Sequence, residues 1–332
     1  MFTAVIIIKP MNPMTLPDVS QWGGACELAD LAVLSLRGAD AATFLHGQLS
    51  QDVQSLAADQ ARLGAYCSAK GRMLASGLLL RPAPDEVWWV LSADVMDATL
   101  KRLRMFVLRA KAQLADERGR IRVTGLLGPT ALAAVPGSDP AALATPGAAQ
   151  LLAEGAGQLV RLPDAGGVQR ALWLAPVDTA LTVTVPTVNL TDWQWLDMLA
   201  GIPQVQAATA DQFVPQMVNY ELVGGVNFKK GCYPGQEVVA RSQYRGTTKR
   251  RLFLAQADGP VHAGQEVFAS TEPEQPAGRV ANAATASQDL GGTLALIELK
   301  LAMRDSPLRV GGPDGVPLTL HPLPYDVPMA DD

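Results

Sequence analysis

Short apolar runs broken by polar turns fill the first third of the chain and predict an antiparallel sheet. The first run, Leu31–Leu36, reads as a strand that ends at the Gly38-Ala39-Asp40 turn, where Asp40 is placed to cap a short helix carrying Phe44 and Leu45. Glycine and proline turns separate the next runs, as in a meander of neighbouring strands. These runs cover residues 63–67, 73–80 and 87–91, and a predicted helix over residues 94–108 follows them.

The pattern changes after Arg251, where short apolar segments alternate with glycine, proline and aspartate. This spacing is typical of a small β-barrel. The predicted strands cover residues 252–255, 266–268, 278–281, 293–301, 308–310 and 318–320. Residues 128–150 are instead rich in alanine, proline and glycine, and they predict an irregular connection.

Strands interrupted by single helices, without a regular alternation, indicate an α+β protein rather than a doubly wound sheet. The 332 residues are 48% apolar and 18% charged, which suits two or three compact domains. No apolar run is long enough to span a bilayer, and the Val5–Ile8 patch is too short for the core of a secretory signal. We therefore expect a cytoplasmic protein.

Positive charge is concentrated in two segments of a chain whose formal net charge is −5. Residues 227–251 carry seven Lys or Arg against one acidic residue, and residues 100–122 carry eight against two. If these segments converge in space, they suit a polyanion such as a polyglutamylated folate tail or an RNA backbone. An alternative stays open for residues 100–122. Apolar residues fall there at helical spacing, namely Leu100, Leu103, Val107 and Ala110, and the charges then form the solvated face of a helix.

The run from Lys229 to Glu237 is the strongest candidate for chemistry. It places Cys232 after two lysines and before a Pro234-Gly235 turn, which is predicted to open a short helix. The unpaired N–H groups of a helix start favour an anion, and so do Lys229 and Lys230. The sequence therefore predicts that Cys232 is exposed and reactive, with its thiolate form stabilised; a buried, inert cysteine is the alternative.

Motifs for other chemistries are missing from the chain. It has no GxxxxGK[ST] phosphate loop, no GxGxxG after a strand and no HExxH. Three unevenly spaced cysteines predict neither a disulfide framework nor a CxxC metal site. His46, His262 and His321 lie far apart, so each is expected to be structural, and no metal site is predicted.

The order and spacing of several motifs resemble the YgfZ-type folate-binding proteins, a branch of the GcvT-like superfamily that also contains the glycine-cleavage aminomethyltransferases. The likeness runs from about Asp30 to Tyr325. The matching residues are Gly38–Asp40, Phe44–Gln48, Asp52, Lys70–Arg72, Gly201–Pro203, Phe213–Gln216, Asn219, Gly224-Gly225, Phe228–Tyr233, Gly235–Glu237, Ala240-Arg241, Arg245-Gly246, Lys249-Arg250 and Pro322–Tyr325.

The resemblance implies two interleaved ferredoxin-like subdomains around a central folate cavity, over residues 27–245, and a C-terminal β-barrel over residues 247–327. It also implies tetrahydrofolate or another reduced folate as cofactor, and it places Leu31 near the ligand. A pterin needs an apolar or aromatic wall and hydrogen-bonding groups at its edge, and Trp193 is predicted to supply the wall. By helical spacing Trp193 and Trp195 point differently, so one is expected to face the ligand and the other to pack; burial of both in the core is the alternative.

The enzymatic chemistry of the aminomethyltransferases does not follow from the resemblance. In those enzymes an aspartate after the glycine turn of the second hairpin assists transfer of the one-carbon unit. The corresponding place here is predicted to be Ala75, whose methyl group cannot transfer a proton. Whether this protein catalyses a reaction is therefore left open.

The YgfZ branch is implicated in the assembly or repair of iron–sulfur clusters in client enzymes, including enzymes of tRNA modification. The resemblance thus implies a folate-binding accessory protein with Cys232 as its functional thiol. One cysteine cannot hold a cluster alone, so any contact with a cluster is expected to be shared or transient. Arg241 and Arg245 are expected to bind acidic groups, and Glu237 to cap or orient the turn. A folate-dependent aminomethyltransferase and a tRNA-binding module are the alternatives.

Overall fold

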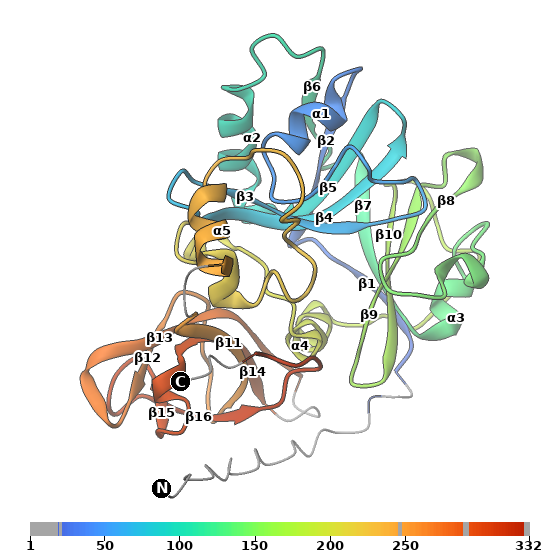
Figure 1. Cartoon of the computed structure of the whole chain (residues 1–332). Coiled ribbons are helices and arrows are strands. Elements are labelled where there is room, and N and C mark those ends of the chain that lie inside the picture. The colour runs from blue at the N-terminus through green and yellow to red at the C-terminus, as the bar shows by residue number, and fades with distance from the viewer. Residues whose placement is uncertain (1–18, 20–21, 245–247, 288–291, 329–332) are drawn as a thin grey trace, which may run out of the picture.

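The computed structural model describes residues 19, 22–244, 248–287 and 292–328 of the chain. Two five-stranded sheets and a closed six-stranded barrel are joined by short helices (Figure 1). The α+β class and the C-terminal barrel that the sequence predicts are both confirmed. The Val5–Ile8 patch lies outside the described residues. So do Arg245 and residue 247, which mark the predicted domain boundary.

The two sheets are interleaved along the chain. The first has the order β1-β7-β10-β9-β8 and the second β3-β4-β5-β2-β6. β1 pairs antiparallel with β7 in the first sheet. All strands of the second sheet, β2 to β6, therefore lie between these two paired strands in the sequence. The strands are β1 Gly24–Glu27, β2 Leu31–Arg37, β3 Arg62–Cys67, β4 Met73–Ala83, β5 Glu86–Ser92, β6 Gln113–Asp116, β7 Ile121–Leu127, β8 Ala149–Leu151, β9 Gln158–Ala165 and β10 Val168–Pro176.

The predicted meander is confirmed as β3, β4 and β5, which pair in sequence order. The helix after Asp40 is also present as α1 (Ala41–His46), but the Asp40 carboxylate accepts from the amide of Lys111 instead of capping it. After the 3₁₀ turn η1 (Ala93–Val95), α2 covers Met96–Arg104, so the helix predicted over residues 94–108 is shorter at both ends.

The prediction of an irregular connection over residues 128–150 is wrong in part. α3 (Gly128–Ala133) begins there with a proline in its first turn, a position where proline favours a helix start because its missing N–H costs nothing. The 3₁₀ turn η2 (Pro140–Leu143) and the first residues of β8 follow. The remaining 3₁₀ turns are η3 Ala153–Gly155, η4 Ala207–Thr209, η5 Pro215–Val218 and η6 Leu301–Met303.

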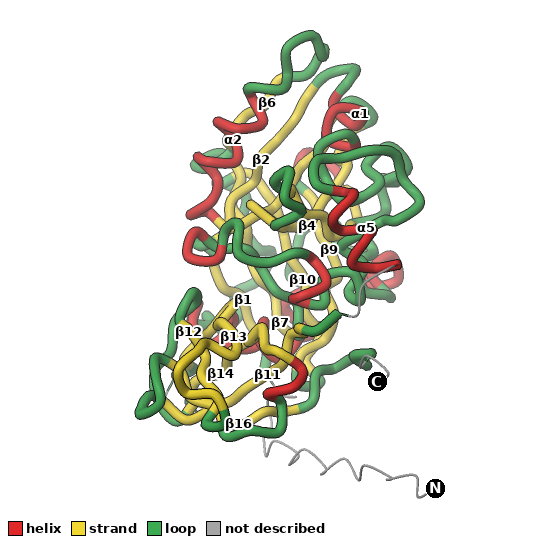
Figure 2. Tube along the Cα trace, turned by 60° about the vertical axis from the view of Figure 1, so that its left-hand side comes forward, coloured by secondary structure: helices red, strands yellow, loops and turns green. Residues whose placement is uncertain are grey.

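All six predicted strands of the barrel are present and pair antiparallel in the order β11-β14-β13-β12-β15-β16, with β16 returning to β11. Closure leaves no unpaired edge on the barrel. The strands are β11 Arg250–Ala257, β12 Glu266–Ala269, β13 Glu272–Thr285, β14 Thr293–Lys300, β15 Leu308–Val310 and β16 Val316–His321. Figure 2 shows the barrel at one end of the molecule and the sheets at the other.

α4 (Leu190–Ala200) packs against β9 of the first sheet and against β13 and β14 of the barrel. Most of its side chains are buried, as expected for a helix that is enclosed rather than amphipathic. It ends at Gly201, whose φ of 67° is the left-handed conformation of a glycine C-cap. α4 therefore joins residues of the barrel and of both sheets in one apolar cluster, while other clusters lie within the individual sheets and the barrel. Within the described residues, we find no helix with the length and apolar character needed to cross a membrane.

Candidate functional site

Two adjoining pockets lie beside α4. The smaller, of about 190 Å³, reaches from the second sheet past α4 to Asn282 on the barrel. The larger, of about 1060 Å³, extends past Arg161 and Lys229 to Tyr325. The two pockets share part of their walls, which is formed by Leu63, Leu78, Leu162, Pro163, Ala200 and Ile202. Small-molecule pockets usually measure about 300–1,000 Å³. The larger pocket reaches that size, whereas the smaller one has room only for a compact part of a ligand.

Leu31 and Trp193, the two residues predicted to lie near a ligand, both line the smaller pocket. Both tryptophans are buried in the core, with Trp193 2% and Trp195 1% exposed, as the alternative expects. Trp195 lines neither of these two pockets, so only Trp193 borders one. The Arg170 guanidinium lies 5.2 Å from the centre of the Trp193 ring. A ligand that uses Trp193 as a wall therefore shares the ring with a fixed cation.

A carboxylate pair lines the same pocket. Asp197, one helical turn after Trp193, accepts a hydrogen bond from Arg170 at 2.5 Å. Burial raises the pKa of Asp197, against the lowering effect of Arg170 and with a further contribution from Asp30. The Oδ2 of Asp30 accepts from Gln194 at 2.7 Å, while its buried Oδ1 has no hydrogen-bond partner. The pocket therefore offers acceptors, one of them unused, to a ligand rich in N–H groups.

Sequence reasoning missed this acidic pair, and no local signal shows it. Asp30 meets Gln194 across 164 positions of sequence, and Arg170 meets Asp197 across 27. Only the packing of α4 on the sheets brings these residues together.

The face of β4 that meets the pocket differs from the expected one. Ala75 is fully buried in the core on the side of the second sheet that α1 and α2 cover. Its neighbour Ser76 lines the pocket, and the Ser76 hydroxyl accepts from the Val205 amide at 2.8 Å. Successive side chains of a strand point to opposite faces, so an aspartate at position 75 would not enter the pocket. The smaller pocket therefore contains carboxyl groups that could take part in acid–base chemistry, those of Asp30 and Asp197, although residue 75 is an alanine.

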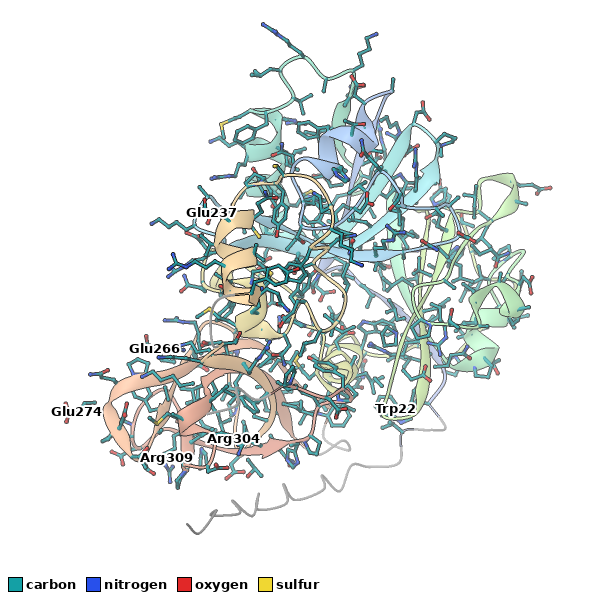
Figure 3. All side chains as sticks on the ribbon, in the orientation of Figure 1. Trp22, Glu237, Glu266, Glu274, Arg304 and Arg309 are labelled. Atoms are coloured by element: carbon teal, nitrogen blue, oxygen red, sulfur yellow. The ribbon has the colours of Figure 1, made fainter. Side chains whose placement is uncertain are left out.

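The Cys232 loop has the predicted form. Cys232 is exposed, and the Pro234-Gly235 turn leads directly into α5 (Gln236–Tyr244). Gly235 has a φ of 78°, and a Cβ there would lie 2.3 Å from the carbonyl oxygen of Ser68, so only glycine fits. Gln236 accepts from the Tyr233 amide at 3.2 Å, so Gln236 rather than Glu237 caps this turn. Glu237 is exposed at the outer edge of α5 (Figure 3).

The two lysines before Cys232 have different environments. Lys229 is exposed and lines the larger pocket. The Lys230 ammonium donates to the carbonyls of His46 and Leu49 and lies 4.9 Å from the centre of the Tyr233 ring. Burial lowers the pKa of Lys230 to about 8. Lys230 thus anchors the loop to the end of α1.

The positive charge counted from the sequence does not form one surface. Arg250 and Arg251 pair with Glu298 and Glu221, and the Arg251–Glu221 pair is almost entirely buried. Arg118 pairs with two aspartates. α2 and α5 lie on opposite sides in Figure 2, and exposed Arg241 on α5 lines neither pocket beside α4. The two basic segments therefore do not converge into the single polyanion-binding surface considered from the sequence.

No profile of a known protein family matches this chain. The solved structure of the glycine cleavage system aminomethyltransferase T from Bartonella henselae is similar to it, with a TM-score of 0.64 over 93% of this chain and 88% of that chain at 17% identity. A heterotetrameric sarcosine oxidase from Corynebacterium sp. U-96 matches over 46% of this chain and 74% of that chain at 18% identity, but its TM-score of 0.27 supports no argument. This chain therefore has the fold of aminomethyltransferase T.

Proposed function

We propose that this protein binds tetrahydrofolate or a related reduced folate beside α4 and serves as an accessory protein in the assembly or repair of iron–sulfur clusters. Its clients include enzymes that modify tRNA, and Cys232 is its functional thiol. The observation that carries the proposal is the smaller pocket, which combines an aromatic residue, Trp193, with an unused buried acceptor on Asp30.

The residues of the pockets fit a folate. The pterin edge carries N–H groups, for which Asp30 and Asp197 offer acceptors, and the apolar wall comes from Leu31 and Trp193. The larger pocket has room for the remainder of the molecule, and Lys229 at its rim supplies a cation for a terminal carboxylate. A bound folate supplies one-carbon or redox chemistry, while the protein's own residues bind it, orient it and exclude water.

Calorimetric titration with tetrahydrofolate tests the binding. Asp197→Asn removes the charge that Arg170 pairs with, and we expect it to weaken binding about tenfold or more, as loss of a charged hydrogen bond does. Asp178→Asn, at an exposed loop position, is the matched control and should bind like the wild type. Equal affinity of Asp197→Asn and the wild type would remove the smaller pocket as the folate site.

Rescue of an iron–sulfur enzyme in a deletion strain tests the role of the thiol. Cys232→Ser should abolish the rescue and leave folate affinity unchanged, since Cys232 lines neither pocket. Full rescue by the serine variant would remove Cys232 from the proposal.

Folate-dependent aminomethyl transfer is a second candidate, and the two carboxyl groups of Asp30 and Asp197 in the smaller pocket favour it, because a carboxyl group beside the ligand can serve as an acid or base in such a transfer. Purified protein should then release ammonia and methylene-tetrahydrofolate from the aminomethylated lipoyl carrier. No turnover at saturating folate would exclude this activity.

A further inference from the structure

A polar cluster outside the pockets lies between the end of α1 and the Cys232 loop. The Nδ1 of His46 is 3.0 Å from the Oδ1 of Asp52, and the two side chains are only 16% and 24% exposed. Burial alone would raise the pKa of Asp52, but hydrogen bonds from Ser55 and the charge of His46 outweigh it and hold the pKa below its usual value. Asp52 is therefore an ionised carboxylate in a fixed position.

The Asp52 carboxylate determines which nitrogen of His46 holds a proton. An ionised carboxylate only accepts, so Nδ1 carries the proton and Nε2 of the neutral ring keeps its lone pair. Nε2 faces the Cys232 loop, because a Cβ on Gly231 would lie 3.6 Å from it. Cys232 directly follows Gly231 in this loop, and their Cα atoms are about 3.8 Å apart. Lys230 keeps the loop here by its hydrogen bonds to the carbonyls of His46 and Leu49.

We propose that His46 accepts the thiol proton of Cys232 and that Asp52 positions the imidazole ring, so that the three residues form a thiol-activating relay. A nucleophile, a base and a third group that orients the base are the usual parts of such a site. This inference rests on the proposed function, because it takes Cys232 as the functional thiol. It adds His46 as the base that accepts the thiol proton. Over the described parts of the chain, no three His, Cys, Asp or Glu side chains gather in a way that could hold a metal ion.

The position of the thiol indicates its substrate class. Cys232 is exposed and lines neither pocket beside α4, so its reaction partner arrives on the surface of another molecule. Cys26 and Cys67 are buried, so neither is available at the surface to resolve a disulfide at Cys232. We assign an exposed disulfide of a partner protein as the substrate.

The exchange is balanced in atoms and electrons. The Cys232 proton passes to Nε2 of His46, the thiolate attacks one sulfur of the disulfide, and a new S–S bond forms as the old one breaks. The departing thiolate takes the proton from the imidazolium. A further cysteine thiol of the partner then gives its proton to Nε2 of His46 and attacks the partner's own sulfur in the mixed disulfide. A new S–S bond forms within the partner as the bond to Cys232 breaks, and the Cys232 thiolate takes the proton back from His46, so no outside oxidant or reductant is consumed.

Thiol reactivity of the intact protein tests the relay, with Ellman's reagent as the disulfide probe and iodoacetamide as a carbon electrophile. Since Cys26 and Cys67 are buried, native protein should react at Cys232 alone. A free cysteine is only a few per cent thiolate at pH 7, so we expect His46→Asn to slow both reactions about tenfold at pH 7. Asp52→Asn should slow them less, because the ring stays but its tautomer is no longer fixed. His262→Asn, at an exposed position in the barrel, should react like the wild type.

Chemical rescue separates a proton acceptor from a structural residue. Added imidazole should restore part of the rate lost in His46→Ala, whose fold is checked by circular dichroism. Unchanged rates in His46→Asn, or a folded His46→Ala variant that imidazole does not rescue, would overturn the relay. Dependence on His46 with iodoacetamide but not with Ellman's reagent would overturn the disulfide as substrate. Tetrahydrofolate affinity is measured on the same variants, so failure of the relay is distinguished from failure of folate binding.

Discussion

Gly125 is the position where one added methyl group should disturb the smaller pocket most selectively. It lies on β7 against the ring of Trp193, and a Cβ there would lie 2.6 Å from two ring atoms. Ordinary contacts of a Cβ begin at 3.4 Å. The ring therefore has to move by about 0.8 Å, which a close-packed interior resists. The φ of Gly125 is one that alanine adopts freely, so the effect comes from crowding alone.

We expect Gly125→Ala to lower the free energy of unfolding by about 1–3 kcal/mol, the usual cost of overpacking. The displaced ring also changes its contact with Arg170, which holds Asp197 in the pocket. Loss of an aromatic contact is worth about 0.5–1.5 kcal/mol, which corresponds to an increase of up to about tenfold in the Kd for tetrahydrofolate.

Urea unfolding followed by far-ultraviolet circular dichroism measures the first quantity, and calorimetric titration measures the second. Gly259→Ala is the matched control, because a Cβ at Gly259 meets Val316 at an ordinary 3.6 Å. Wild-type stability and affinity in Gly125→Ala would show that Trp193 is not packed against β7 as described, and the link between this ring and the pocket would fail.

Three further variants test the core. Glu221→Gln leaves buried Arg251 without its charged partner and should lower the free energy of unfolding by about 3–5 kcal/mol, measured in urea; a loss below 1 kcal/mol would mean that the pair is solvated. Burial raises the pKa of Cys67 to about 12, so the stability it contributes is complete below pH 9 and is lost as the pH rises toward 12. Cys67→Ala should flatten the decline of Tm above pH 9, and an unchanged slope would contradict this. Tyr220→Phe removes the hydrogen bond to the Gly64 carbonyl and should cost about 1 kcal/mol, with no effect on labelling of Cys232.

The elements that the sequence predicts well are those whose pattern is local. Strands of the barrel alternate with glycine, proline and aspartate turns, and each of the six is found near its predicted place. The predicted cap of α1 is wrong because the Asp40 carboxylate accepts a hydrogen bond from the amide of Lys111, which is distant in the sequence. The sequence pattern does not predict α3, because proline usually interrupts a helix, whereas Pro129 lies in the first turn, where proline is tolerated.

Some residues of the candidate site can likewise be predicted from the sequence, and others cannot. The exposed position of Cys232 follows from the turn beside it, and the resemblance to a family led to Trp193. The acidic pair at α4 and the contact of His46 with Asp52 depend on side-chain geometry that spacing does not encode. The sequence predicts a structural role for His46, because a single histidine carries little information until its neighbours, here Asp52, are known.

Interleaving has a consequence for how this chain matures on the ribosome. Strands β2 to β6 are contiguous and can associate as soon as they emerge, whereas Glu27 must wait for Thr124 before β1 finds its partner. Until then the backbone N–H and C=O groups of β1 have no strand partner in the nascent polypeptide, so β1 is open to mispairing. Truncation before β7 should therefore yield a chaperone-dependent, aggregation-prone fragment rather than a folded half.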